Sequence, residues 1–435
     1  MEKDSAQYTS GLTTVLTMLG VAVGLGNVWR FPYMMGSYGG SAFLVVYLLL
    51  TVLFAFPALM AEMALGRMSS KGTLDAFRLA FGRQVGGIFG YGLLVVITIA
   101  GAYYAVVVAN VLYTTFFSMM KGFTTENNSD YISGLSNGGL QYFITLLLIG
   151  SSLFVIHKGL LKGIEFLSKI IMPFFLVAIV YMIFHALTLP DALTKCKEFL
   201  TPDFSLLGVP EVFAALGQAF FSVGLGGTFV IVYSGFMRKE ESIVKMALYT
   251  GLGDAGASLL ISLFLIPSIL VFGLDMASGP RLIFNTFPQL FATMPGGRLV
   301  GSLFLICIAL VAFLSLVAAY QVPFTCIKNE QTNPNGKRIL IVIGLIQCGL
   351  ALPCSLFPEI IGSLDLIFGS GMQVFGSALA IIGLTWGINR SEVFQELFRS
   401  GGNSAMQRAV YYWIKWIIPL ALLAVLIGYV YDVLF

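Results

Sequence analysis

The residues best suited to chemistry lie at two copies of one motif, Val-Gly-Leu-Gly, at 23–26 and again at 223–226, each within a long apolar stretch. Glycine costs a helix interior about 1 kcal/mol relative to alanine, and a third glycine stands at each copy, Gly20 near the first and Gly227 at the second. We therefore expect the chain to unwind at both places. Unwinding exposes carbonyls that suit a hard cation and amides at the start of the next half-helix that suit a carboxylate.

Polar side chains beside both copies add the donors that such a pair of ions needs. Asn27 follows the first copy, and its amide oxygen is a suitable cation ligand. Ser222 precedes the second copy and offers a hydroxyl, while the adjacent Phe221 is a candidate apolar cap. A cation beside a carboxylate is what joint binding of sodium and an amino acid requires. The alternative is a glycine-rich face for helix packing, which leaves Asn27 and Arg30 unexplained.

Carboxylates inside apolar stretches point the same way, because each is expensive to bury unless it has a partner. Asp254 is the only acid between residues 249 and 272, and we expect it to bind the cation rather than to mark a helix end. We expect Glu62 to pair locally and to support the structure. Arg30 and Asp365 are expected to form an outer salt bridge that opens and closes; the alternative is two unrelated interface charges.

The composition identifies a membrane protein. Of the 435 residues, 58% are hydrophobic and 10% are charged, whereas soluble domains carry roughly 25% charged residues. One transmembrane domain over 1–435 is expected, with the lipid bilayer and a small molecule as partners and no nucleic acid. No nucleophile–base pair or zinc-ligand spacing stands out, so no enzyme is indicated. The five cysteines are expected to be unpaired, and His157 and His185 to be uninvolved.

About 20 apolar residues cross a bilayer, and the sequence predicts eleven such spans. They are 12–37, 41–65, 86–119, 138–156, 166–188, 211–236, 244–272, 299–327, 338–357, 362–388 and 408–433. A short amphipathic segment, 281–292, is expected on the outer face between spans seven and eight. Of the 24 Lys and Arg residues, 17 fall in segments on the side of the N-terminus and five on the other side. The positive-inside rule therefore predicts a cytoplasmic N-terminus and, after eleven spans, an external C-terminus.

The two glycine motifs are 200 residues apart, with about five spans between them. Because five is odd, the second half enters the membrane from the opposite side, which predicts an inverted-topology repeat. The repeats extend over approximately 10–190 and 205–390, and helix 408–433 is additional. Broken helices at matching places in two such halves are typical of a binding site at the bilayer midplane.

The segment Gly24-Leu25-Gly26-Asn27-Val28-Trp29-Arg30-Phe31-Pro32-Tyr33 resembles the signature of the neurotransmitter:sodium symporter family. Matches at 57–67, 217–222 and 294–297 extend the resemblance over nearly the whole chain. It implies an all-α integral membrane protein with the LeuT fold and broken first and sixth helices, similar to bacterial amino-acid members with eleven spans. It also implies sodium-coupled uptake of an amino acid across the cell inner (plasma) membrane by alternating access.

The resemblance assigns roles to particular residues. The first sodium ion would be bound by Ala22 through its carbonyl, Asn27, Ser222 and Asp254, and Tyr104 with Phe221 would cover the substrate. The substrate contacts would be Ala22, Leu25, Gly26, Tyr104, Phe221, Ser222 and Ser315, with Ala100, Gly224, Gly227 and Ala319 as lining positions. Because these lining residues are small, we expect a bulky hydrophobic or aromatic amino acid. Monoamine carriers have an aspartate where Gly24 stands, which again favours an amino acid.

Departures from the family pattern leave some expectations open. The second sodium site would use Gly20, Val23, Val311 and Ser315, but Leu314 replaces a hydroxyl residue. Three alternatives stay open: weak sodium binding, replacement of the missing ligand by water, and loss of the site; one or two sodium ions are expected. The inner-gate positions hold Ser5, Phe236 and Asn329, so inner closure must use other contacts. Tyr47, Gln218, Ser222 and Ser258 match chloride-dependent members, yet Asp254 already supplies a negative charge one helical turn from Ser258, so chloride is not expected to be required.

Other functions on the same fold fit these departures. A proton-coupled or uncoupled amino-acid exchanger is the first alternative, since Leu314 and the altered inner gate both weaken the case for sodium. A non-transporting amino-acid sensor is the second. A channel is disfavoured, because no ring or run of pore-lining polar residues is apparent.

Overall fold

The computed structural model describes residues 7–276, 282–399 and 404–434, and the described residues form helices and no strands. The inner-gate position Ser5 lies outside the described residues. Two of the charges that flank predicted spans, Lys3 and Arg281, lie outside them as well. The helices without strands confirm the predicted all-α class for the described residues.

Nine helical stretches in the described part of the chain are long and apolar enough to cross a membrane. They are Ser41–Ser69 (α3 to α4), Arg83–Met120 (α6), Gly138–His157 (α8), Leu160–Leu187 (η3 and α9), Ile243–Val271 (α13), Gly297–Glu330 (α15), Gly336–Leu356 (α16), Ile360–Gly387 (α17 to η7) and Ala405–Gly428 (α20 to α21). One broken pair, α1 with η1 and α2 (Gly11–Ala22, then Gly26–Ser37), passes the same test as a single bent span. α11 and α12 (Val209–Ser222, then Phe229–Ser234) correspond to the remaining predicted span, 211–236, but do not pass it, so the described residues contain up to ten spans by length and composition where the sequence predicted eleven.

Both breaks occur at the predicted glycine motifs. The first pair bends by 64°, because α1 ends at Ala22 and Val23 adopts an extended conformation. In the second, Gly224 and Gly227 have φ of 71° and 69°, values that side-chain-bearing residues rarely adopt. Glu62 on α4 steadies this segment, since its buried carboxylate accepts hydrogen bonds from the amides of Gly226 (3.0 Å) and Gly227 (3.1 Å). The predicted structural role of Glu62 thus has partners 164 and 165 residues away in the sequence.

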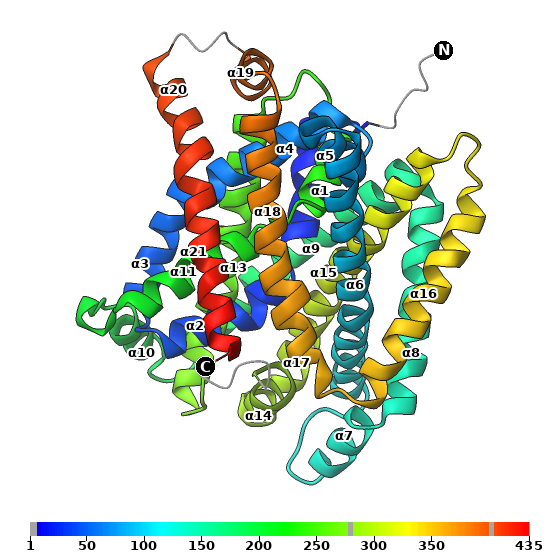
Figure 1. The fold of residues 1–435 in the computed structure, drawn as a ribbon. Coiled ribbons are helices and arrows are strands. Elements are labelled where there is room, and N and C mark those ends of the chain that lie inside the picture. Colours follow the sequence, from blue (N-terminus) through cyan, green and yellow to red (C-terminus); the bar gives the residue numbers. More distant parts are fainter. Residues whose placement is uncertain (1–6, 277–281, 400–403, 435) are drawn as a thin grey trace.

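The connecting segments alternate between the two ends of the bundle (Figure 1). The beginning of α1 lies at the same end as α5 (Thr73–Phe81) and α19 (Arg390–Phe398), whereas α21 (Ile418–Leu434) finishes at the opposite end. The opposite end also carries α7 (Asn128–Leu135), α10 (Ala192–Phe199) and α14 (Phe287–Thr293). This alternation matches the predicted order of spans, and η5 with α14 occupies the predicted amphipathic segment from residue 282 onward. We call the end with α5 and α19 the inner end, following the charge-based orientation, and the other the outer end.

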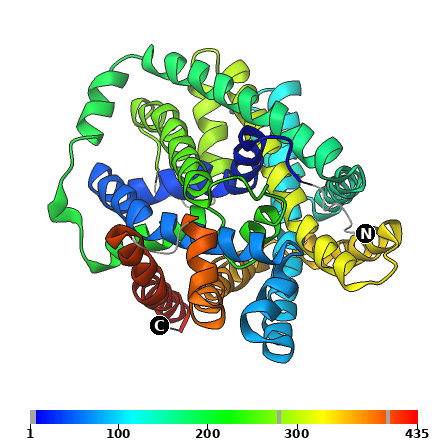
Figure 2. The same ribbon diagram turned by 90° about the horizontal axis from the view of Figure 1, so that it is seen from above.

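The helices differ strongly in burial. In α15 and α6, 72% and 67% of the most apolar window is buried, compared with 33% in α8 and in the α20–α21 stretch. Seen along the bundle, α1 lies among other helices while α21 lies at the periphery (Figure 2). The unwound segments themselves are enclosed by protein, because residues 23–25 and 225–228 are buried, which is the condition under which unwound backbone is tolerated at membrane depth.

Candidate functional site

A cavity of about 380 Å³ lies between the two helix breaks and is lined mostly by apolar side chains. Ten of the eleven predicted substrate residues line it: Ala22, Leu25, Gly26, Ala100, Tyr104, Phe221, Ser222, Gly224, Ser315 and Ala319. Its lining continues toward the outer end as far as Ile283, Pro358 and Asp365. Specific ligand pockets typically hold about 300–1,000 Å³, so this volume fits one small molecule.

Gly227 does not line this cavity, contrary to the prediction. Its amide donates to Glu62, and a Cβ at this position would lie 2.8 Å from the carbonyl oxygen of Gly376. The glycine is therefore required by its contacts with α4 and α18 (Met372–Ile382) and not by the size of a ligand. The predicted small lining residues that do face the cavity are Ala100, Gly224 and Ala319.

A buried polar cluster forms the base of the first break. Asn27 Nδ2, which carries two protons, lies within hydrogen-bond distance of three oxygens: Asp254 Oδ1 (2.7 Å), Ser258 Oγ (2.9 Å) and Ser222 Oγ (3.1 Å). Ser222 in turn donates to Asp254 Oδ2 over 2.5 Å. The oxygen of Asn27 accepts from the Gly24 amide at 2.9 Å. Three predicted sodium-binding side chains thus meet, and Ala22 lines the adjoining cavity.

Three of the four predicted chloride-matching residues, Tyr47, Ser222 and Ser258, belong to or adjoin the same cluster. Tyr47 on α3 lies near Asp254, Ser222 and Ser258. The Tyr47 hydroxyl and both polar side-chain atoms of Gln218 are buried and have no hydrogen-bond partner within the described residues. The cluster therefore contains one buried carboxylate and, in the Tyr47 hydroxyl, one polar atom without a partner among the described residues.

The predicted second sodium positions converge at the end of α1. The hydroxyl of Ser315 lies 3.3 Å from the Val21 carbonyl oxygen, 3.4 Å from that of Val23 and 3.3 Å from that of Val311. One hydroxyl proton satisfies one acceptor, so three carbonyl oxygens around it form an oxygen-rich site suited to a cation. Val21 is a member that the sequence did not predict. Leu314 packs on Gly20, because a Cβ there would lie 3.0 Å from Leu314 Cδ1.

The outer-gate residues lie above the cavity. The Arg30 guanidinium stacks on the Phe221 ring, 4.3 Å from its centroid, and donates to Ser370 Oγ at 3.2 Å. Asp365 accepts from the Tyr103 hydroxyl at 3.0 Å and lines the outer part of the cavity. Ser370 and Asp365 belong to one wide helical turn, η6 (Asp365–Gly371). Arg30 is thus joined through Ser370 to the turn that carries Asp365.

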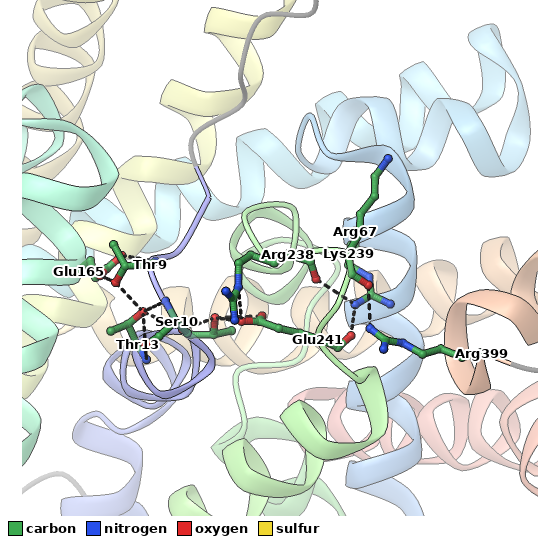
Figure 3. Close-up of polar contacts among 10 residues, drawn as sticks. Thr9, Ser10, Thr13, Arg67, Glu165, Arg238, Lys239, Glu241 and Arg399 are labelled. Carbon is green, nitrogen blue, oxygen red and sulfur yellow. Dashed lines mark hydrogen bonds and ion pairs between the residues drawn. The ribbon is translucent and has the colours of Figure 1, made fainter.

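The inner end is held by two buried carboxylates that the sequence did not single out. Glu241, after α12, accepts from Thr14 Oγ1 at 3.0 Å and from Arg238 Nε at 3.2 Å, and Arg67 donates to its backbone carbonyl. Glu165 accepts from the Thr9 amide at 3.3 Å and also from the Thr9 hydroxyl. Figure 3 shows these contacts joining the start of α1 to neighbouring elements. The only sequence signal for either acid was its place beside an apolar span.

The substituted inner-gate positions make backbone contacts instead. Phe236 accepts through its carbonyl oxygen from the Tyr8 amide at 3.1 Å, and the two rings meet edge-on with centroids 6.2 Å apart. Asn329 donates from Nδ2 to the carbonyl oxygen of Lys71 at 2.7 Å.

An apolar helix bundle with two broken helices around a central cavity, and with a buried acid at the first break, defines a secondary transporter. The chain belongs to the sodium:neurotransmitter symporter family, whose model matches residues 5–134 and 123–433. It is thus a sodium-dependent membrane transporter of that family, which is not a family of enzymes.

Similar proteins cover most of the chain. The sodium-dependent transporter YhdH of Bacillus subtilis is 26% identical, and the match covers 98% of each chain. The sodium-dependent transporter MJ1319 of Methanocaldococcus jannaschii is 31% identical over 79% of this chain and 74% of its own length. The crystal structure of MhsT in complex with L-phenylalanine superposes with a TM-score of 0.86 at 26% identity, covering 98% of this chain and 99% of that one. These matches confirm the predicted family and the LeuT fold.

Proposed function

We propose that the chain couples sodium to the uptake of a bulky hydrophobic or aromatic amino acid. The observation that carries this proposal is the cavity between the breaks, whose polar end adjoins Asp254 and Ser222 while its wall includes Ala100, Gly224 and Ala319. A cavity that is polar at one end and apolar elsewhere suits an amino acid with a large apolar side chain. The bound L-phenylalanine in the similar MhsT structure supports the same substrate class.

Each end of the amino acid has candidate partners. Its carboxylate would accept hydrogen bonds from the amides of Leu25 and Gly26 and from the hydroxyl of Tyr104. That hydroxyl lies beside the first break, since a Cβ added to Gly24 would be 3.5 Å from it. The first sodium ion would lie between that carboxylate and Asp254, with Ser222 and the Ala22 carbonyl as further ligands. Asn27 would join them by turning its amide oxygen, which here accepts from the Gly24 amide, toward the ion. Sodium thereby cancels the repulsion between the two carboxylates. Binding of each ion strengthens binding of the other, which is the basis of coupling.

Alternating access follows from the contacts at the two ends. With sodium and substrate bound, Arg30 and Phe221 would close over the cavity, and Arg30 with Asp365 would form the outer gate. Inner opening would then require the Thr14–Glu241 and Thr9–Glu165 contacts to break. We propose that these contacts replace the family's inner gate in this chain. The N-terminus would be cytoplasmic and the C-terminus external.

The experiment that tests this proposal is thermal unfolding of the purified protein with each of the twenty amino acids, in sodium chloride and in potassium chloride. A ligand at 100 times its dissociation constant stabilises the folded state by about 2.7 kcal/mol. Stabilisation by a few bulky amino acids, only in sodium, is the expected result. Selectivity for glycine or alanine would overturn the substrate class, and equal stabilisation in both salts would favour an exchanger or a sensor.

Two extensions settle the remaining alternatives. Replacing sodium chloride by sodium gluconate is expected to leave the stabilisation unchanged, because Asp254 supplies the negative charge beside the first sodium ion. Uptake into proteoliposomes under a sodium gradient separates a transporter from a sensor, since a sensor binds the amino acid without accumulating it.

A further inference from the structure

A hollow of about 570 Å³ lies at the inner end of the bundle and shares no lining residue with the central cavity. Two connections of the chain form it, the one from α8 to η3 (Leu160–Glu165) and the one from α15 to α16. Figure 1 shows both connections at the end of the bundle that carries α5. The proposed function uses no residue of this hollow.

The hollow lies at the level of the lipid headgroups. α8 has 20 residues and α16 has 21, so at about 1.5 Å per residue each helix is about as long as the hydrocarbon core is thick. The hollow lies where α8 ends and α16 begins, which is where helices of this length leave the hydrocarbon. Both helices lie at one side of the bundle (Figure 1), and the most apolar windows of α8 and α16 are only 33% and 44% buried. The hollow is therefore accessible from the lipid.

Positive charge dominates the hollow. Lys328, in the last turn of α15, and Lys337, at the start of α16, line it together with His157. No aspartate or glutamate lines it among the described residues, and neither lysine forms an ion pair with that part of the chain. Glu330, the acid that follows Lys328 in the sequence, is paired with Arg78 at 2.5 Å. The start of α16 adds the positive end of its helix dipole. The hollow is therefore suited to an anion.

An aromatic ring joins the two basic elements. Phe324 is buried in the wall of the hollow. The Lys328 ammonium lies 5.7 Å from the centroid of this ring, and a Cβ added to Gly336 would lie 3.8 Å from its Cζ atom. Lys328 and the start of α16 thus lie against the same ring, so that Lys328 and Lys337 line one hollow from two helices.

Apolar side chains continue from the hollow toward the middle of the bilayer. Ile156 and Leu340 are buried in its wall. Further along the same two helices, Phe154 on α8 and Ile341 and Leu345 on α16 are exposed. A molecule in the hollow can therefore place an anionic group against the lysines and apolar chains against the helices.

We propose that this hollow binds the phosphate headgroup of an anionic phospholipid from the leaflet at the inner end. Basic pockets between transmembrane helices at this level are suited to such headgroups. Lys328 and Lys337 bind the phosphate oxygens, and the acyl chains lie along the exposed apolar side chains of α8 and α16. The bound lipid links the two connections that form the hollow. This proposal does not depend on which amino acid or ion the central cavity binds.

The test is thermal unfolding of the purified, delipidated protein in neutral detergent, titrated with phosphatidylglycerol or with zwitterionic phosphatidylcholine. Phosphatidylglycerol is expected to raise the unfolding temperature more than phosphatidylcholine does. Lys328→Gln combined with Lys337→Gln is expected to raise the half-stabilising phosphatidylglycerol concentration by about tenfold or more, because two cationic partners of the headgroup are lost. Lys328→Arg combined with Lys337→Arg keeps both charges and is expected to behave like the wild type.

A matched pair of lysines provides the control. Lys239 and Lys245 are exposed at the inner end and do not line the hollow, so Lys239→Gln combined with Lys245→Gln removes the same net charge outside the proposed site. This variant is expected to leave the titration unchanged. An equal loss of the phosphatidylglycerol response in both double variants would assign the effect to the net charge of the inner end and overturn the site.

Soluble phosphates distinguish a lipid from a free anion. Inorganic phosphate and glycerol phosphate, added without lipid, are expected to stabilise the protein little, because they lack the acyl chains. Stabilisation by either one that depends on Lys328 and Lys337 and equals that of phosphatidylglycerol would overturn the assignment to a lipid. Equal stabilisation by phosphatidylglycerol and phosphatidylcholine would overturn it as well. In sodium, the Lys328→Gln and Lys337→Gln protein is expected to keep its stabilisation by amino acids, since the hollow and the central cavity share no residue.

Discussion

Asn27 and Asp254, 227 residues apart in the sequence, are joined by a hydrogen bond of 2.7 Å from the amide nitrogen of one to the carboxylate of the other. The oxygen of the same Asn27 side chain accepts from the Gly24 amide at 2.9 Å. One side chain therefore holds the open end of α1 and positions the buried acid of α13. The Gly24 amide, next to the amides proposed for the substrate, and the acid proposed for sodium belong to one hydrogen-bonded unit.

Removing the charge of Asp254 is predicted to abolish sodium-dependent binding. Asp254→Asn keeps a polar group of similar size beside Asn27 and Ser222, so its main effect is the loss of a negative ligand. The affinity for sodium, measured by the sodium concentration needed for amino-acid stabilisation, is expected to fall by at least about tenfold, which equals about 1.4 kcal/mol. The exposed Asp130→Asn serves as the control, since surface ion pairs such as Lys121–Asp130 contribute about 0–1 kcal/mol. Unchanged sodium affinity would remove Asp254 from the site.

A methyl group at Gly26 is predicted to block closure over the substrate. A Cβ there would lie 2.7 Å from Phe221 Cε1, and the Phe221 ring has little room to retreat because Arg30 stacks on its face. Gly26→Ala is expected to lower amino-acid affinity by about tenfold or more, measured by thermal stabilisation. Gly256→Ala on α13 is the matched control, because nothing lies within 4 Å of its Cβ position. Equal loss of binding in both variants contradicts the steric explanation.

The carboxylate of Glu62 is predicted to stabilise the second break. Glu62→Ala leaves the buried amides of Gly226 and Gly227 without an acceptor, and each unsatisfied buried amide costs about 1–3 kcal/mol. The unfolding temperature is expected to drop markedly, and amino-acid binding is expected to weaken because Gly224 and Ser222 lie on the same segment. Glu126→Ala, at an exposed outer position, should do neither. A normal unfolding temperature for Glu62→Ala would show that the break does not depend on this contact.

Breaking the inner contacts is predicted to favour inner opening. Thr14→Val and Glu241→Gln each weaken the 3.0 Å bond between α1 and the segment after α12, a contribution of about 1 kcal/mol. Faster efflux of preloaded amino acid from proteoliposomes without sodium is the expected result. The effects of the two substitutions on efflux should be less than additive in the double variant, because both remove the same interaction.

The neighbouring acid provides the control for this experiment. Glu240 is exposed, so Glu240→Gln changes the same net charge without touching α1. Efflux that rises equally in Glu240→Gln would assign the effect to surface charge and not to the buried contact.

Several features of this protein were predictable because they depend on nearby residues. Hydropathy over about 20 residues set the spans, and the spacing of Gly20, Gly24 and Gly26 set the first break, since backbone conformation responds mainly to local residue type. Asp254 was recognisable because an acid within a long apolar stretch is costly without a function. The distribution of Lys and Arg predicted which end faces the cytoplasm, and that orientation stays a prediction.

Only the tertiary structure decided which distant groups meet. The partners of Glu62 at Gly226 and Gly227, the orientation of Gly227 away from the cavity, and the contacts of Glu165 with Thr9 and of Glu241 with Thr14 depend on how helices 150 or more residues apart pack together. Local residue types therefore determined where this chain breaks and crosses the membrane, whereas helix packing determined which buried polar groups share a site.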